Sequence, residues 1–120
     1  MCILVVEDDP LIRMILAEEL LDAGYEVREA ESGDHAVAVF ETIRPTPRVL
    51  VTDVHMPGRH DGLDLAAHVR ARLPTISVVF TTGRPDALLR LDSLGDKQVL
   101  VRKPYAPSEV IQRVRALLAA

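Results

Sequence analysis

Five short strand-like runs recur along the chain, and a segment with helical periodicity or helix-capping residues follows each of them. Most of the runs are continuously apolar, which is typical of strands buried on both faces of a parallel sheet. One run alternates, which indicates a strand with one exposed face. The predicted strands are Cys2–Val6, Tyr25–Ala30 (the alternating run), Val49–Asp53, Ser77–Thr82 and Val99–Arg102.

The segments between these runs carry helix signals. Asp9 is a natural N-cap for a first helix, Pro10 suits its first position, and Gly24 suits the position past its end. Ser32 can cap a second helix, and apolar spacing predicts a third over about residues 65–73, a weaker fourth over 85–94 and a last one from Pro107. The apolar stripe of the first helix consists of Ile12, Ile15, Leu16 and Leu20.

A strand followed by a helix, repeated along the chain, predicts an α/β domain with a parallel five-stranded sheet and helices on both faces. A length of 120 residues suits one hydrophobic core. The sequence contains no linker-like or low-complexity stretch. We therefore expect one doubly wound domain over residues 1–120, with no output domain in this chain.

Composition narrows the class of function. A net charge of -4 and the absence of Trp argue against direct binding of nucleic acid. Cys2 is the single cysteine, and it is expected to be a core thiol in a reducing compartment. No apolar run approaches the roughly 20 residues of a membrane helix. We expect a cytoplasmic protein that does not contact a membrane.

Polar residues collect where the predicted strands end. Ligands of open parallel sheets bind outside these carboxyl ends. The residues concerned are Glu7, Asp8 and Asp9 after the first strand, Asp53 at the end of the third, Thr82 at the end of the fourth and Lys103 after the fifth. Each of them alone has an ordinary explanation as a turn residue, a cap or a solvated side chain, and for Asp9 the helix cap is the preferred one.

Together, these residues at the strand ends indicate a reactive site. Carboxylates on neighbouring strand ends repel one another unless a divalent cation or an ammonium group lies between them. The chain has 14 basic residues, and only Lys97 and Lys103 are lysines, so a lysine at this edge stands out. Carboxylates, a cation, an ammonium and a hydroxyl make a site for phosphoryl transfer in which an aspartate can be the nucleophile.

Four motifs carry a family resemblance over essentially the whole chain. They are "LVVEDDP", "VTDVHMPGRHDG", "VVFTTG" and "VRKPY", in this order and spacing. Together they resemble the receiver domain of bacterial two-component response regulators. The resemblance implies a flavodoxin-like (βα)5 fold with strand order 2-1-3-4-5. It also implies a histidine-to-aspartate phosphorelay, in which the domain catalyses only its own phosphorylation and dephosphorylation and is not a turnover enzyme.

The resemblance assigns expected roles by position. Asp53 matches the phosphoacceptor, and Thr82 and Lys103 match the hydroxyl and lysine residues that contact the phosphoryl group. The expected Mg²⁺ (or Mn²⁺) ligands are Asp8, Asp53, the backbone carbonyl of His55 and, through water, Glu7. The bond before Pro104 is expected to be cis. The implied partners are a sensor histidine kinase or histidine phosphotransfer protein and an unidentified downstream effector, which is contacted through the fourth helix, fifth strand and fifth helix.

Three departures from the family pattern are visible. The "MPGRHDG" loop is one residue longer than usual, with Arg59 or His60 as the insertion. Leu100 replaces the usual aromatic residue of the fifth strand, and Tyr105 does not occupy the equivalent position. His55 and Arg84 occupy the two positions that tune dephosphorylation in this family, and we hypothesise that they shield the phosphoryl group from water.

Other classes of protein share some of these features. A haloacid dehalogenase-like phosphatase uses similar residues, but it requires an aspartate where this chain has His55. A receiver-like interaction module that is never phosphorylated is kept open by Leu100. A dinucleotide-binding domain fits poorly, because acids stand where a glycine-rich turn is needed. The remaining histidines, His35, His60 and His68, lack metal-ligand spacing and are expected to be surface residues.

Overall fold

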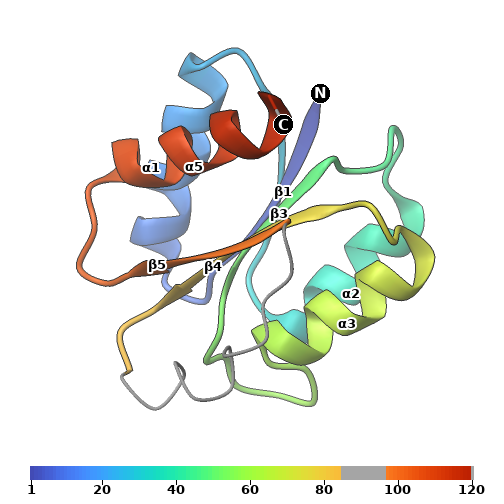
Figure 1. Ribbon diagram of the computed structural model, residues 1–120. Helices are drawn as coiled ribbons and strands as arrows, with labels where there is room; N and C mark the ends of the chain where they lie inside the picture. The colour runs from blue at the N-terminus through green and yellow to red at the C-terminus, as the bar shows by residue number, and fades with distance from the viewer. Residues whose placement is uncertain (85–96, 120) are drawn as a thin grey trace.

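A computed structural model of the protein describes residues 1–84 and 97–119. Five parallel strands form one sheet in the order β2-β1-β3-β4-β5 (Figure 1). The strands are β1 (Cys2–Val6), β2 (Glu26–Ala30), β3 (Val49–Asp53), β4 (Ser77–Thr82) and β5 (Gln98–Arg102). The predicted parallel sheet and its implied strand order are confirmed.

Helices cover both faces of the sheet. Helices α1 (Pro10–Asp22) and α5 (Pro107–Ala119) lie side by side on one face, and α2 (Gly33–Thr42) and α3 (Gly62–Arg72) lie on the other (Figure 1). The predicted fourth helix at 85–94 lies outside the described residues. Within the described chain, none of the helices has the length and apolarity needed to cross a bilayer.

The central strands are apolar throughout because each of their faces packs against a helical layer. Successive side chains of β1 point to opposite faces, so Ile3 and Val5 join the core beneath α1 and α5, whereas Leu4 and Val6 join the core beneath α2 and α3. At the edge of the sheet, β2 exposes most of its side chains, and exposure does not alternate strictly along the strand. Two hydrophobic cores thus hold one sheet in register.

The predicted boundaries agree with the structure to within one residue for the strands. Tyr25 precedes β2, and β5 begins at Gln98. The predicted apolar stripe of α1 does share one side of the helix, where Ile12, Ile15 and Leu16 line one groove. Burial differs along it: Ile15 is 37% exposed, whereas Leu16 and Leu20 are buried. The cause is that α1 packs against its neighbours through a narrow face, which leaves Ile15 beside a surface groove.

Helix caps set where the chain turns from strand to helix. The Asp9 carboxylate accepts hydrogen bonds from the backbone N–H groups of Leu11 (2.9 Å) and Ile12 (3.3 Å), and Ser32 caps α2 in the same manner. Asp61 and Asp64 form a reciprocal capping box at the start of α3. Gly24 has a φ of 98°, which ends α1 in a conformation that favours glycine.

We predict that Asp9→Ala lowers the free energy of unfolding by about 1 kcal/mol, because two N–H groups of α1 lose their acceptor. Urea denaturation followed by circular dichroism measures the effect. Glu18→Ala, which removes an exposed carboxylate from the same helix, is the matched control. Equal stability of the two variants would contradict the capping role of Asp9.

Candidate functional site

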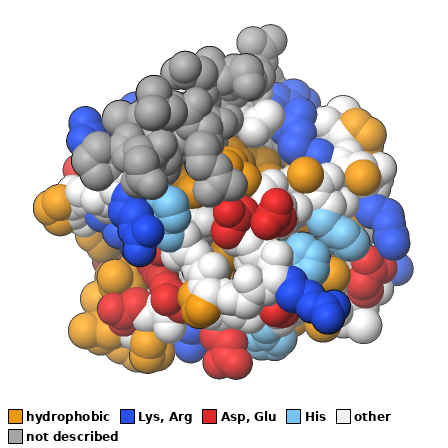
Figure 2. Space-filling view, turned by 90° about the horizontal axis from the view of Figure 1, so that it is seen from below, with side chains coloured by type: hydrophobic (Ala, Val, Ile, Leu, Met, Phe, Trp, Pro, Cys, Tyr) orange, Lys and Arg blue, Asp and Glu red, His pale blue; other side chains and the backbone are white. Residues whose placement is uncertain are grey.

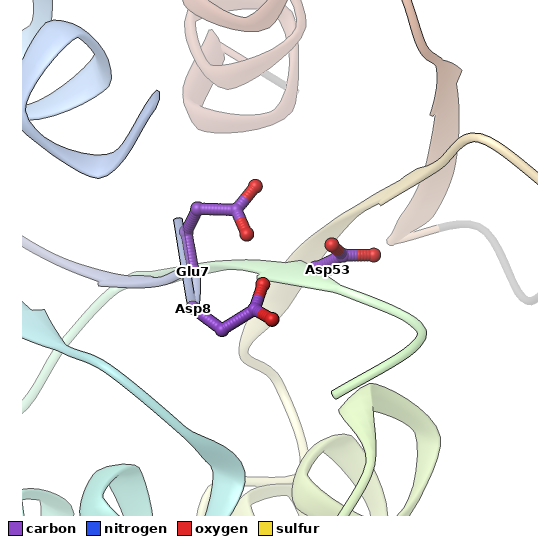
Figure 3. A group of neighbouring side chains, drawn as sticks. All are labelled: Glu7, Asp8 and Asp53. Atoms are coloured by element: carbon purple, nitrogen blue, oxygen red, sulfur yellow. The ribbon is translucent and has the colours of Figure 1, made fainter. Parts of the chain in front are cut away.

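Three carboxylates meet at the carboxyl edge of the sheet. Glu7 and Asp8 follow β1, and Asp53 ends the neighbouring strand β3. Each side chain offers one oxygen, and these three oxygens lie within 4.8 Å of one another (Figure 3). Figure 2 views this end of the molecule and shows acidic side chains gathered near its centre with histidines around them. The structure thus brings together the acids that the sequence placed on separate strand ends.

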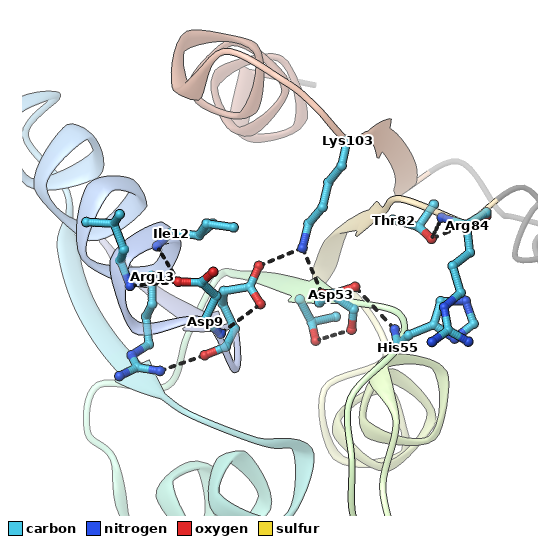
Figure 4. A network of polar contacts seen from close by, with 11 residues as sticks. Asp9, Ile12, Arg13, Asp53, His55, Thr82, Arg84 and Lys103 are labelled. Atoms are coloured by element: carbon cyan, nitrogen blue, oxygen red, sulfur yellow. Dashed lines mark hydrogen bonds and ion pairs between the residues drawn. The ribbon is translucent and has the colours of Figure 1, made fainter.

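Lys103 lies between two of these acids. Its Nζ donates to Glu7 Oε1 and to Asp53 Oδ2, at 2.8 Å in each case (Figure 4). The backbone holds Lys103 at this place, because its N–H donates to the Thr82 carbonyl at 2.7 Å. The Lys103–Pro104 bond is cis, as the resemblance implied.

Burial controls the electrostatics of Glu7. Only 2% of Glu7 is exposed, and this burial, together with the neighbouring carboxyl of Asp8, raises its pKa to about 7 against the opposing effect of Lys103. Burial works against the charge of Lys103, but its hydrogen bonds to Asp53 and Glu7 outweigh that effect and raise its pKa. The pocket therefore retains an ammonium while one of its carboxyls tends to keep a proton.

The hydroxyl of Thr82 does not contact Asp53. It accepts a hydrogen bond from the backbone N–H of Arg84 at 3.1 Å, within the turn that follows β4. The backbone N–H of His55 instead donates to Asp53 Oδ1 at 3.2 Å (Figure 4). Thr82 therefore lies on the neighbouring strand with its hydroxyl engaged in its own turn.

A hollow of about 460 Å³ opens beside the acids. It is lined by Asp8, His55, Met56, Pro57, Asp61 and Arg84. His55 Nε2 is buried and has no hydrogen-bond partner in the described structure. The two positions expected to shield the phosphoryl group, His55 and Arg84, thus border the same hollow.

The donor set of this edge suits a hard divalent cation. Mg²⁺ prefers carboxylate and carbonyl oxygens and keeps several waters. Asp8 is exposed and borders the open hollow, while Asp53 and Glu7 are buried next to it. The residues present therefore fit a hydrated Mg²⁺ or Mn²⁺ ion.

Asp34, which the sequence did not single out, anchors the extended loop after β3. Its carboxylate accepts from the backbone N–H groups of Arg59 (3.2 Å) and His60 (3.0 Å) and lies 2.7 Å from His60 Nδ1. Contact with His60 lowers the pKa of Asp34. Asp34 stands in the first turn of α2, so the loop that contains Arg59 and His60 is tied to that helix.

The prediction that the three remaining histidines are surface residues is confirmed: His35 is exposed, and the side chains of His60 and His68 are 34% and 31% exposed. His60 and His68 are half-buried and pair with Asp34 and Glu41, respectively. Sequence periodicity could not reveal these pairs, because their members are 26 and 27 residues apart. Cys2 is a buried core thiol, as predicted.

Leu100 and Tyr105 lie against different cores. Leu100 is half-buried against the core beneath α2 and α3, whereas Tyr105 packs against the core beneath α1 and α5. Burial raises the pKa of Tyr105 to about 12, and its hydroxyl has no hydrogen-bond partner in the described residues. Tyr105 is therefore not a spatial substitute for the aromatic residue that Leu100 replaces.

Comparison with known proteins decides the family. A family model described as the response regulator receiver domain matches residues 3–115. The chain belongs to this family. It is thus a receiver domain of two-component signal transduction, and the four motifs had pointed to the correct family.

Relatives and solved structures agree with this assignment. The receiver domain is 38% identical over 114 residues to the transcriptional regulatory protein PdtaR of Mycobacterium tuberculosis, covering 93% of this chain and 54% of that protein. A response regulator receiver protein from Sinorhizobium medicae superposes with a TM-score of 0.89 at 24% identity, covering 100% of this chain and 95% of that one, which supports the fold alone.

A third comparison is with a solved response regulator of higher identity. Response regulator TrrA from Thermotoga maritima, solved in complex with Mg²⁺-BeF, has a TM-score of 0.81 and 31% identity, with 97% of each chain covered. The receiver domain spans about half the length of the curated relatives that it matches.

We predict a pH dependence of stability in the metal-free domain. The folded state raises the pKa of Glu7 from 4.5 to about 7, so between these values the folded protein holds a proton that the unfolded chain releases. The free energy of unfolding therefore falls as pH rises across this window, by at most about 1.4 kcal/mol per pH unit from this group.

Urea titrations in EDTA from pH 5 to 7.5 test this prediction. In Glu7→Gln the free energy of unfolding should depend less on pH, so its stability relative to the wild type should increase as pH rises. Glu18→Gln, which alters an exposed carboxyl on α1, should follow the wild type. Parallel profiles for wild type and Glu7→Gln would show that Glu7 ionises equally in both states.

Proposed function

We propose that this receiver domain accepts a phosphoryl group on Asp53 from a phosphohistidine, in a reaction that depends on Mg²⁺ or Mn²⁺. The observation that carries the proposal is the bridge of Lys103 between Glu7 and Asp53, beside a third carboxylate on Asp8. A structural ion pair needs one acid for one ammonium. Here two acids share one ammonium and a third acid, Asp8, lies beside them, which leaves room for a divalent cation.

The proposed reaction is a displacement at phosphorus. An oxygen of the Asp53 carboxylate forms a bond to phosphorus, and the bond between phosphorus and the donor imidazole nitrogen breaks. The electron pair of that bond stays on the imidazole. The ammonium of Lys103 is within hydrogen-bond distance of Asp53 Oδ2, so it can neutralise charge on the phosphoryl oxygens.

Other residues hold and adjust this site. Asp8, Asp53 and the His55 carbonyl would hold the cation, with Glu7 acting through water. When bound, the cation supplies positive charge opposite the phosphoryl oxygens. Thr82 would release its turn to contact the phosphoryl group, and this change would shift the equilibrium of the output face that includes β5 and α5. His55 and Arg84 would limit access of water through the hollow that they border.

Two groups of experiments separate this proposal from a module that is never phosphorylated. The first uses acetyl phosphate with Mg²⁺ and measures intact mass. We expect the wild type and Asp22→Asn, an exposed control at the end of α1, to gain one phosphoryl group. Asp53→Asn, and the wild type in EDTA, should gain none. Uptake by Asp53→Asn would overturn the site, and no uptake by the wild type would favour the binding module.

The surface that receives the phosphodonor protein lies next to Lys103. An apolar groove of about 460 Å³ is lined by Ile12, Ile15, Leu16, Lys103, Pro104, Tyr105 and Pro107. Leu11 and Met14 of α1 are exposed nearby on the same helix, at 60% and 47%. A protein that presents a phosphohistidine to Asp53 approaches the same edge of the sheet, so we propose that its apolar side chains occupy the groove.

The second group of experiments tests that surface with Ile15→Glu. We expect transfer from a phosphorylated histidine protein that is active on the wild type to slow by about tenfold, which corresponds to ~1.4 kcal/mol. Uptake from acetyl phosphate should stay at the wild-type rate, because the acids and Lys103 are unaltered. Leu21→Glu, at an exposed apolar position of α1 that does not line the groove, is the control. Equal slowing with both donors would refute a docking role for the groove.

A further inference from the structure

Arg13 connects α1 to the acidic loop. It is half-buried, with its side chain 18% exposed, and its guanidinium makes two contacts on different elements. One Nη donates to the backbone carbonyl of Glu7 at 2.7 Å (Figure 4). Nε lies 3.5 Å from the Glu29 carboxylate on β2. Neither contact involves the oxygens that face the expected cation.

The carbonyl of Glu7 lies just past the end of the strand ladder. The register of β1 with β3 ends at Val6, and the Glu7 N–H still donates to the Ala30 carbonyl on the other side. The Glu7 carbonyl points to Arg13 instead of to a strand. Because a peptide unit is planar, fixing this carbonyl also fixes the N–H and the Cα of Asp8.

We propose that Arg13 is a positioning residue for the cation site. By holding the Glu7–Asp8 peptide, it orients the Asp8 carboxylate toward Asp53 before the cation arrives. This inference rests on the proposed cation site. The ion pair with Glu29 restrains the guanidinium from its other side and offsets its charge.

Charge and positioning predict opposite effects on cation binding. A guanidinium near the acids repels a divalent cation, so removing its charge alone would tighten Mg²⁺ binding. Removing a group that orients a metal ligand weakens metal binding, typically by about tenfold. The sign of the change in Mg²⁺ affinity therefore distinguishes the two roles.

Isothermal titration calorimetry of the whole chain with Mg²⁺ is the test. We expect Arg13→Gln to raise the Kd for Mg²⁺ by about tenfold, which means weaker binding. Arg13→Lys, which keeps a charge and one donor but loses the planar fork, should lie between Arg13→Gln and the wild type. Glu29→Gln keeps the donor to the Glu7 carbonyl and should change the Kd by less than about twofold.

Thermal unfolding in EDTA shows which variants are folded at the temperature of the titration. If Arg13→Gln is not folded there, the Kd of Arg13→Lys is compared with that of the wild type instead. As a second readout, the Mg²⁺ concentration for half-maximal uptake of phosphate from acetyl phosphate should rise by the same factor as the Kd. An unchanged or tighter Kd in Arg13→Gln, with normal binding by the wild type, would overturn the role of Arg13 alone. A wild type that binds no Mg²⁺ would overturn this role together with the proposed site.

Discussion

The arrangement of this receiver domain depends on one ammonium group held between two buried carboxylates. Lys103 Nζ lies 2.8 Å from both Glu7 and Asp53, although the three residues come from the ends of different strands. Without that ammonium, two acids at the edge of a low-dielectric core would repel each other. The ion pairs therefore compensate for placing acids side by side at this edge of the sheet.

The sheet makes this compensation possible. Parallel pairing of β1, β3, β4 and β5 brings all of their carboxyl ends to one edge, and the two apolar layers leave the strands little freedom to shift. A shift of one residue would turn every side chain of a strand to the other face. Packing of the hydrophobic cores thus determines where the polar residues at the ends of the strands lie.

Loops at this edge are tied down by contacts from the helices on either side. Arg13 of α1 holds the carbonyl of Glu7, and Asp34 of α2 holds the loop of Arg59 and His60. Gly62 allows α3 to start against β3, because a Cβ there would collide with the carbonyl oxygen of Asp53. In contrast, the hydroxyl of Thr82 bonds within its own turn and not to a neighbouring helix.

The sequence by itself determined the strands, the caps at Asp9 and Ser32, the family and the set of residues at the strand ends. These features follow from local patterns: apolar runs, short-range hydrogen bonds and motif spacing. The sequence also suggested an ammonium among these acids. Only the tertiary structure decided that Lys103 reaches both Glu7 and Asp53, that Ile15 faces a groove, and that Arg13 and Asp34 anchor loops. Local periodicity could not predict these contacts, because each depends on how separate elements pack against one another in three dimensions.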